Sequence, residues 1–246
     1  MKIAVFGARG RMGTEVCQAV EAAEDLELVA GIDAGDPRTP ALTADVIVDF
    51  THPSAVLDNL TWAIGHGRHV VVGTTGFTPE RLDQVRAMVE QAPATGVVIA
   101  PNFAIGAVLM MHFAAQAAPY FDSVEIIEAH HTGKADAPSG TAETTARLVA
   151  EARAAAGLGP VPDATTRERA GARGTAVDGI HVHSIRLPGL IANQEVRLAS
   201  AGETLTIVND ARARACYMPG VLAAVRWVPD HPGLTVGLET VLGLRR

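Results

Sequence analysis

The stretch Lys2-Ile3-Ala4-Val5-Phe6-Gly7-Ala8-Arg9-Gly10-Arg11-Met12-Gly13 decides the fold of this chain. An apolar run with the character of a buried strand passes directly into three glycines spaced three residues apart, and a helical pattern follows over 11–23. Such a turn brings the N-terminus of a helix close to a phosphate group. The stretch predicts the start of a dinucleotide-binding unit. Taken alone, it is also compatible with a glycine-rich turn that binds nothing.

The first hundred residues continue this alternation of apolar and amphipathic segments. Further strands are expected at 26–32, 46–50, 69–72 and 97–100, and further helices at 53–66 and 78–91. Strands that alternate with helices form a parallel sheet with right-handed crossovers. The predicted fold class is therefore α/β, with a Rossmann-like parallel-sheet nucleotide-binding domain.

The pattern changes after Phe103 and predicts a smaller α+β domain. Helices are expected at 104–118 and from Ser139 to Ala156, a strand at 124–129, a long loop at 157–179, and strands at 181–187, 190–199 and 203–208. The last three favour a mixed, mostly antiparallel sheet. A helix at 221–227, preceded by Pro219-Gly220, and a strand at 234–238 complete the pattern.

Composition narrows the class of protein. The 246 residues carry a net charge of −7, which argues against broad nucleic-acid binding because phosphate neutralisation needs a basic face. No apolar run approaches the ~18 residues of a membrane span, and the N-terminal pattern is not that of a secretory leader, so we expect a cytoplasmic protein with no membrane partner. Cys17 and Cys216 lie far apart in sequence, and no disulfide is expected in a reducing compartment.

Asp33 strengthens the dinucleotide interpretation. It lies at the end of the second predicted strand, 20 positions after Gly13 (33 − 13), where a carboxylate would meet the adenosine ribose hydroxyls. A carboxylate there repels the 2′-phosphate of NADPH, whereas Arg9 and Arg11 attract it. We therefore expect either NADH or NADPH to bind. The loops that start at Gly73 and Ala100 follow predicted strands, and ligands of open parallel sheets bind at such strand ends.

The run from Glu128 to Thr141, Glu-Ala-His-His-Thr-Gly-Lys-Ala-Asp-Ala-Pro-Ser-Gly-Thr, indicates where the chemistry occurs. It combines two imidazoles and an ammonium with the start of a helix, a site suited to an anion that undergoes proton transfer. Adjacent strand residues face opposite ways, so His130 and His131 need not share one site. His181 and His183 alternate on a later strand and leave a metal site as an alternative.

These motifs resemble the 4-hydroxy-tetrahydrodipicolinate reductase family, also called the dihydrodipicolinate reductase family. The similarity covers nearly the whole chain and rests on residues 7–13, Asp49-Phe50-Thr51, Gly73-Thr74-Thr75-Gly76, Ala100-Pro101-Asn102-Phe103 and the run from His130 to Thr141. It implies NAD(P)H-dependent reduction of a cyclic dicarboxylic imine with loss of water, on the diaminopimelate route to lysine. It also implies a homotetramer built through the sheet of the second domain, and no metal.

The resemblance assigns parts to the two domains. Residues 1–103 and 214–246 would form the dinucleotide-binding domain, and 104–213 the substrate-binding and tetramerisation domain. His130 would donate or accept a proton and Lys134 would donate one. The implied substrate contacts are His131, Gly140 and Thr141. The implied cofactor contacts are Gly7, Ala8, Arg9, Gly10, Arg11, Met12, Asp33, Gly73, Thr74, Thr75, Ala100, Pro101, Asn102 and Phe103.

One departure, one further match and three alternatives accompany this interpretation. In some relatives an arginine follows the acidic residue of the second strand, but Ala34 follows Asp33 here, which weakens a strict preference for NADPH. Arg214 and Tyr217 match a segment that approaches the nicotinamide in relatives, with tyrosine at a usually aromatic position. The alternatives are a reductase of another amino or imino dicarboxylate, a nucleotide-sensing protein without turnover, and a zinc hydrolase.

Overall fold

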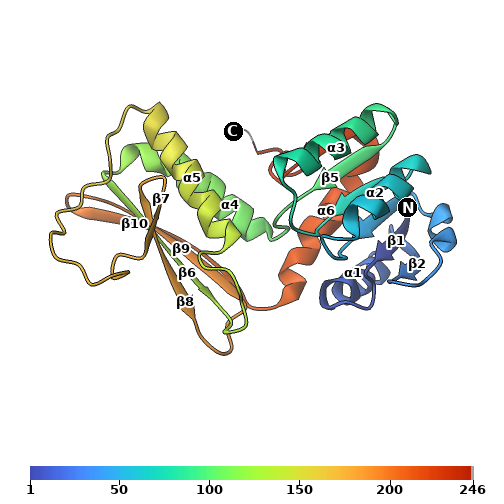
Figure 1. Cartoon of the computed structure of the whole chain (residues 1–246), viewed down its shortest axis with the longest axis horizontal. Helices are drawn as coiled ribbons and strands as arrows, with labels where there is room; N and C mark the ends of the chain where they lie inside the picture. Colours follow the sequence, from blue (N-terminus) through green and yellow to red (C-terminus); the bar gives the residue numbers. More distant parts are fainter. Residues whose placement is uncertain (245–246) are drawn as a thin grey trace. The chain divides into compact units, whose positions relative to one another are not determined.

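The computed structural model describes residues 1–244, which form two compact units (Figure 1). The first comprises Met1–Ile105 and the described chain from Arg214 on, and the second comprises Gly106–Ala213. Residues 245 and 246, the last two of the predicted dinucleotide-binding domain, lie outside the described residues. None of the helices in 1–244 is long and apolar enough to cross a bilayer.

The first unit confirms the predicted parallel sheet. Its six strands within the described chain lie in the order β11-β5-β4-β3-β1-β2, and every pairing is parallel. The strands are β1 (Lys2–Phe6), β2 (Glu27–Ile32), β3 (Val46–Asp49), β4 (His69–Val72), β5 (Gly96–Ile99) and β11 (Gly233–Val236). The α-helices are α1 (Arg11–Glu21), α2 (Val56–Gly65), α3 (Pro79–Glu90) and α6 (Met218–Trp227), and the 3-10 helices are η1 (Thr39–Thr43), η3 (Arg214–Tyr217) and η4 (Val228–Asp230).

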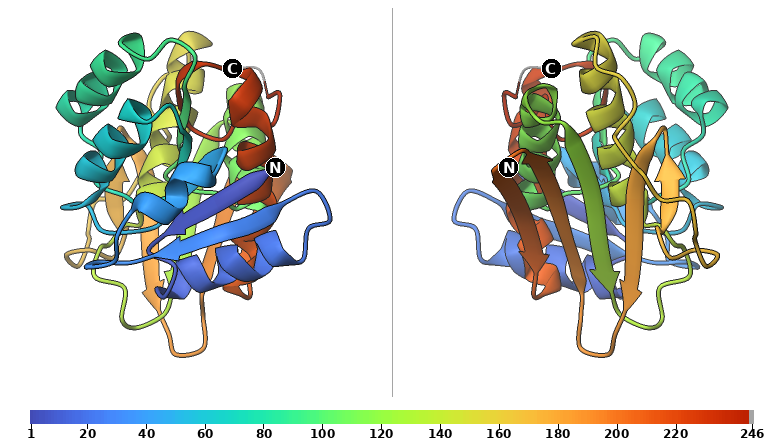
Figure 2. Two further views of the ribbon diagram at one scale, coloured as in Figure 1. Left: turned by 90° about the vertical axis from the view of Figure 1, so that its right-hand side faces the viewer. Right: turned by 90° about the vertical axis from the view of Figure 1, so that its left-hand side faces the viewer.

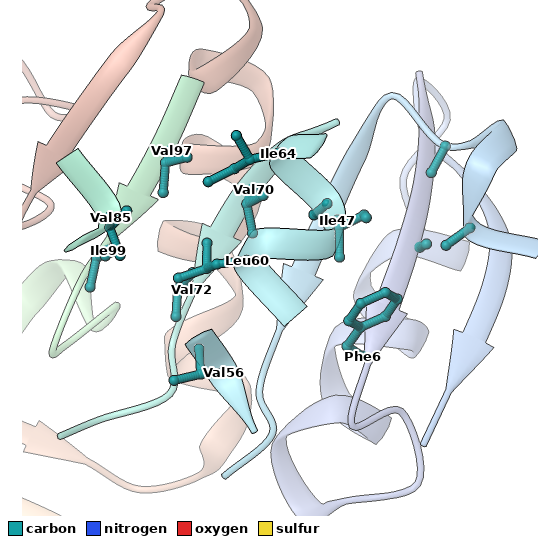
Figure 3. Packing of buried hydrophobic residues seen from close by; sticks show 14 of the residues in the cluster. Phe6, Ile47, Val56, Leu60, Ile64, Val70, Val72, Val85, Val97 and Ile99 are labelled. Atoms are coloured by element: carbon teal, nitrogen blue, oxygen red, sulfur yellow. The ribbon is translucent and has the colours of Figure 1, made fainter. Parts of the chain in front are cut away.

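The central strands are apolar along most of their length because helices cover both faces of this sheet. Helices α2 and α3 contact one face, and α1 and α6 lie against the other. Figure 3 shows the cluster beneath α2 and α3, where Phe6, Ile47 and Val72 of the strands meet Leu60 and Val85 of the helices. This double burial holds the carboxyl ends of the strands, and the loops that follow them, in fixed positions.

The second unit contains the predicted mixed, mostly antiparallel sheet. Its five strands in the described region are ordered β10-β9-β6-β8-β7, and only β6 and β8 pair in parallel. Helices α4 and α5 lie on one face of the sheet. The right-hand view of Figure 2 shows the opposite face turned toward the viewer. The elements are α4 (Ile105–Ala117), η2 (Ala118–Tyr120), β6 (Ser123–His130), α5 (Gly140–Ala155), β7 (Thr175–Val177), β8 (Ile180–Arg186), β9 (Ala192–Ser200) and β10 (Glu203–Ala211).

Several predicted boundaries differ from the structure by one to three residues, and two differences have a clear physical reason. The expected loop 157–179 contains β7, which pairs with β8 across a two-residue turn formed by Asp178 (φ +48°) and Gly179 (φ +83°). Asp-Gly favours such hairpin turns, but a strand of three residues is too short to show an alternating pattern. The last helix begins at Met218 rather than after Pro219-Gly220, because proline is tolerated in the first turn of a helix, where its missing N–H costs no hydrogen bond.

Candidate active site

Two glycines that follow β1, Gly7 and Gly13, lie too close to neighbouring backbone to carry a side chain. A Cβ atom on Gly7, whose φ is +79°, would lie 2.6 Å from the carbonyl oxygen of Phe50. A Cβ atom on Gly13 would lie 1.9 Å from the carbonyl oxygen of Gly7, so helix α1 can pack against the loop only without one. Gly10, the N-cap of α1, is exposed and has no side chain to cover the first backbone N–H groups. This cradle fits a pyrophosphate.

Asp33 is bound to the glycine loop itself. Its Oδ2 accepts a hydrogen bond of 2.9 Å from the backbone N–H of Arg9, and the Arg9 Nε lies 3.3 Å from the same oxygen. Asp36 adds a second carboxylate, 2.8 Å from an Arg9 Nη, and also accepts the backbone N–H of Asp33. That N–H, more than Arg9, lowers the pKa of Asp36. The Arg9 side chain therefore lies between two acids, an arrangement that the sequence did not indicate.

The loop after β4 rests on a buried carboxylate. Asp49, at the end of β3, is 1% exposed and accepts the hydroxyl of Thr74 at 2.8 Å. It also accepts the Thr51 hydroxyl at 2.7 Å and the Asn59 amide at 2.8 Å. A Cβ atom on Gly73 would lie 2.1 Å from a ring carbon of Phe50. The buried acid and the ring thus fix the main chain at the start of this loop.

The segment after β5, residues 100–103, is fixed by packing of its last side chain and by a hydrogen bond with the backbone. Phe103 is 3% exposed, and its ring lies 5.9 Å from that of Phe50, centroid to centroid. The side chain of Asn102 accepts the backbone N–H of Ala104 at 2.8 Å. Helix α6 passes close by at Gly220, where a Cβ atom would lie 2.1 Å from the carbonyl oxygen of Phe103.

The structure brings the cofactor residues predicted from sequence to one edge of the parallel sheet. They follow the carboxyl ends of β1, β2, β4 and β5, on either side of β3 in the strand order. Arg11, Thr75 and Pro101 are exposed at this edge, and Ala8 and Met12 are half-buried. Arg214 and Tyr217 lie in η3 of the same unit, where burial raises the pKa of Tyr217.

In the second unit, a fully buried carboxylate lies beneath His130. Glu128 and His130 are two residues apart on β6 and therefore face the same side of the sheet. The Nδ1 of His130 lies 2.5 Å from Glu128 Oε2, and Arg186, at the end of β8, donates to both carboxylate oxygens at 2.8 and 2.9 Å. Burial alone would raise the pKa of Glu128, but hydrogen bonds from Arg186, Ser184 and His130 hold it below its ordinary value.

The surroundings of His130 favour its neutral form. Burial lowers its pKa, the charges of Lys134 and Arg186 lower it further, and Glu128 opposes them without prevailing. A neutral imidazole that donates Nδ1–H to a carboxylate leaves Nε2 as a proton acceptor. The His130 side chain as a whole is 14% exposed.

Lys134 follows in a turn, with its backbone N–H bonded to the carbonyl of His131 at 3.2 Å. Its ammonium lies 2.8 Å from a carboxylate oxygen of Asp136, and its side chain is 21% exposed. This ion pair lowers the pKa of Asp136, first through the hydrogen bond from Lys134. Arg186 reaches the same turn and donates to the backbone carbonyl of Asp136 at 2.7 Å.

Helix α5 begins directly after this turn. Ser139 is its N-cap, and its hydroxyl accepts the backbone N–H of Ala142 at 3.2 Å. Gly140 is exposed, and a Cβ atom there would meet no atom within 4 Å. The first turn, with Gly140 and Thr141, therefore presents a favourable dipole and backbone donors to an anion. His131 is half-buried beside Gly133, just after β6.

The alternative metal site has no support in the described part of the chain, where no three His, Cys, Asp or Glu side chains come together as ligands. His183 instead contacts Glu125 at 2.8 Å, and the Nδ1 of His181 contacts the carbonyl of Arg173 at 2.7 Å. Sequence reasoning included Glu128 and Asp136 in the run from Glu128 to Thr141 but assigned them no role, and it missed Arg186 altogether. The spacing of Glu128 and His130 on one strand could have indicated a role for Glu128.

Comparisons with known proteins agree with this geometry. The family described as dihydrodipicolinate reductase, N-terminus, matches residues 1–103, and its C-terminal counterpart matches residues 106–242. Proteins named 4-hydroxy-tetrahydrodipicolinate reductase are 61% identical over 244 residues in Cutibacterium acnes and 63% identical over 245 in Thermobifida fusca, covering at least 99% of each chain. A dipicolinate-bound dihydrodipicolinate reductase from Paenisporosarcina sp. has a TM-score of 0.85 and 39% identity, covering 98% of each chain.

Proposed function

Because the chain belongs to the dihydrodipicolinate reductase family, we propose that it reduces 4-hydroxy-tetrahydrodipicolinate to tetrahydrodipicolinate on the diaminopimelate route to lysine. One hydride and one proton are taken up, and one water leaves. The observation that carries the proposal is the fold of the Glu128–Thr141 run, which presents an imidazole, an ammonium and an open helix start in succession.

The first unit would hold NADH or NADPH, which supplies the hydride when bound. Gly7 and Gly13 let the loop pack closely against Phe50 and helix α1, and Gly10 leaves the start of α1 uncovered, which supports pyrophosphate binding by residues 7–12. Asp33 would accept the ribose hydroxyls, and the loops at 73–75 and 100–103 would line the remaining edge of the sheet. Two carboxylates beside Arg9 favour NADH without excluding NADPH.

The second unit would hold the substrate and handle its protons. One substrate carboxylate would lie on the backbone N–H groups of Gly140 and Thr141, with His131 beside it. Hydride addition leaves an electron-rich enamine that collects a proton, and Lys134 is the proposed donor. His130, neutral and with Nε2 unprotonated, would take up or return a proton at the ring.

The assay follows oxidation of NADH and NADPH, with substrate generated from pyruvate and aspartate semialdehyde by the preceding synthase. The sequence contains only two lysines, Lys2 and Lys134, so Lys2→Ala is a matched control. We expect Lys134→Ala and His130→Ala to lower kcat by about 100-fold or more while the Kd for NADH changes less than about twofold. Equal losses of turnover and cofactor affinity would assign Lys134 a structural role. Cofactor binding without turnover by the wild type would point to another imine substrate.

Self-association is the second part of the proposal. The sheet face opposite α4 and α5 carries half-exposed apolar side chains, including Ile185 (41%) and Val208 (54%), and these support a homotetramer formed through this sheet. Sedimentation should give four times the 25.6 kDa chain mass, and Val208→Lys should lower it. A monomer at micromolar concentration would refute the tetramer. A cytoplasmic location is proposed with it, since both cysteines are free thiols.

A further inference from the structure

Glu128 is a buried carboxylate with an unusual set of partners. It is 0% exposed, and its oxygens accept from His130, from both Nη atoms of Arg186, and from the backbone N–H of Ser139 at 3.3 Å. A buried carboxylate without a cation is strongly destabilising. Arg186 is therefore the group that allows Glu128 to remain ionised beneath the site.

The ion pair of Glu128 and Arg186 connects three separate segments of the site. The Glu128 carboxylate binds Nδ1 of His130 at the end of β6, and it accepts the backbone N–H of Ser139 at the start of α5. Through the 2.7 Å hydrogen bond from Arg186 to the carbonyl of Asp136, the pair holds the turn that carries Lys134. Asp136 in turn binds the Lys134 ammonium with its carboxylate. The imidazole, the ammonium and the helix start therefore share one anchor.

We propose that Glu128, kept ionised by Arg186, is the positioning residue of this site, which fixes the ring orientation and tautomer of His130 and the placement of the Lys134 turn. Its catalytic effect rests on the function proposed above. A carboxylate that accepts Nδ1–H orients the ring and leaves the second nitrogen, Nε2, free to accept a proton from the reacting groups. In the other tautomer Nε2 carries the proton, so a histidine at the same position cannot accept one there. Three charged groups face His130: Glu128, Lys134 and Arg186.

The chain supplies a matched control on the same strand. Glu125 of β6 also binds one histidine and one arginine, His183 and Arg173, but it lies on the opposite face of the sheet and its side chain is 33% exposed. Glu125→Gln and Glu128→Gln therefore make the same chemical change beside the same kinds of partner. Only the second change touches the anchor described above.

The experiment combines kinetics with imidazole NMR. In the wild type at pH 7, nitrogen chemical shifts should report the Nδ1–H tautomer of His130. Glu128→Gln should lower kcat about 100-fold, leave the Kd for NADH within about twofold, and move the His130 titration to lower pH, because Glu128 favours the protonated ring. Glu125→Gln should keep kcat within about twofold. Arg186→Lys keeps the charge but loses the two-pronged contact, and should lower kcat about tenfold.

Each outcome separates the two proposals. An Nε2–H tautomer in the wild type would overturn the inference whether or not the protein turns over the substrate. This measurement uses only the wild type, so it does not depend on the folding of any variant. Unchanged kcat and an unchanged His130 titration in a folded Glu128→Gln variant would overturn it as well. The expected tautomer in a wild type that fails to reduce the substrate would retain the positioning role of Glu128 and reject the proposed reaction.

Discussion

Replacing Asp49 by alanine tests how a buried acid holds the cofactor edge of the first unit. The carboxylate lies at the end of β3 and is 1% exposed. One oxygen accepts the Thr51 backbone N–H at 3.0 Å and the hydroxyls of Thr51 and Thr74 at 2.7 and 2.8 Å, and the other accepts the Asn59 amide at 2.8 Å. Removing it leaves two buried donors, those of Thr74 and Asn59, without this acceptor.

The magnitude follows from those two donors. Each buried donor that loses its main acceptor costs up to about 1–3 kcal/mol. Thr74 keeps a 3.5 Å contact with the Asp49 backbone carbonyl, and Asn59 keeps a 3.3 Å contact with the Thr51 hydroxyl. The lower half of that range applies because the substitution also removes the desolvation cost of a buried carboxylate, which offsets part of the loss. We therefore expect Asp49→Ala to lower the free energy of unfolding by about 3 kcal/mol, which corresponds to a decrease in Tm of about 6–12 °C for a chain of this size.

Thermal unfolding followed by circular dichroism provides the measurement, and Asp58→Ala provides the control. Asp58 belongs to the same unit and pairs with Arg38, but its side chain is 73% exposed, so its loss should cost less than about 1 kcal/mol. The Kd for NADH should also rise in Asp49→Ala, because Thr74 loses its anchor. A Tm for Asp49→Ala equal to that of Asp58→Ala would refute the reasoning.

Two further perturbations act on exposed charges. Asp36→Asn leaves Arg9 with one carboxylate instead of two, so titration calorimetry should show NADPH binding about two- to fivefold tighter with NADH nearly unchanged; an equal change for both would contradict this. The hydrogen bond from Arg226 lowers the pKa of Asp25 from 3.8 to about 2, so this pair stabilises the fold above about pH 4 and loses its effect as pH falls through 2. The urea midpoints of wild type and Asp25→Asn should therefore differ most at pH 5 and much less at pH 2, where the carboxyl is about half protonated in the native state, and a difference that grows on acidification would exclude this role.

Most of the fold could be predicted because its determinants are local. The alternation of apolar strands with amphipathic helices predicted the parallel sheet, and the break after Phe103 predicted the second one. The place of β11 beside β5 could not be predicted, because two segments 137 residues apart (233 − 96) meet there through tertiary packing. The strand β7 escaped for a different reason, since three residues at a sheet edge carry too little pattern.

The site residues divide in the same way, into those that a local motif contains and those that tertiary contacts bring in. His130, Lys134, Gly140 and Thr141 lie within twelve residues, so one motif contained them all. Arg186 comes from another strand and reaches Glu128 only because β6 and β8 pair in parallel, with His130 opposite Arg186. No spacing in the sequence contains that information. Sequence reasoning found the groups proposed to act on substrate. It assigned no role to Glu128 and Asp136 and did not find Arg186, the three residues that hold those groups.

The order of the two units along the chain has a consequence for folding during synthesis. Residues 106–213 form a continuous unit, whereas the first unit lacks α6 and β11 until the chain beyond Arg214 emerges from the ribosome. Until then β5 is an unprotected sheet edge, and such edges invite pairing with other chains. The unit whose synthesis begins first is thus the one completed last, and a nascent chain that stalls before β11 leaves the apolar strand β5 open to pairing with other chains.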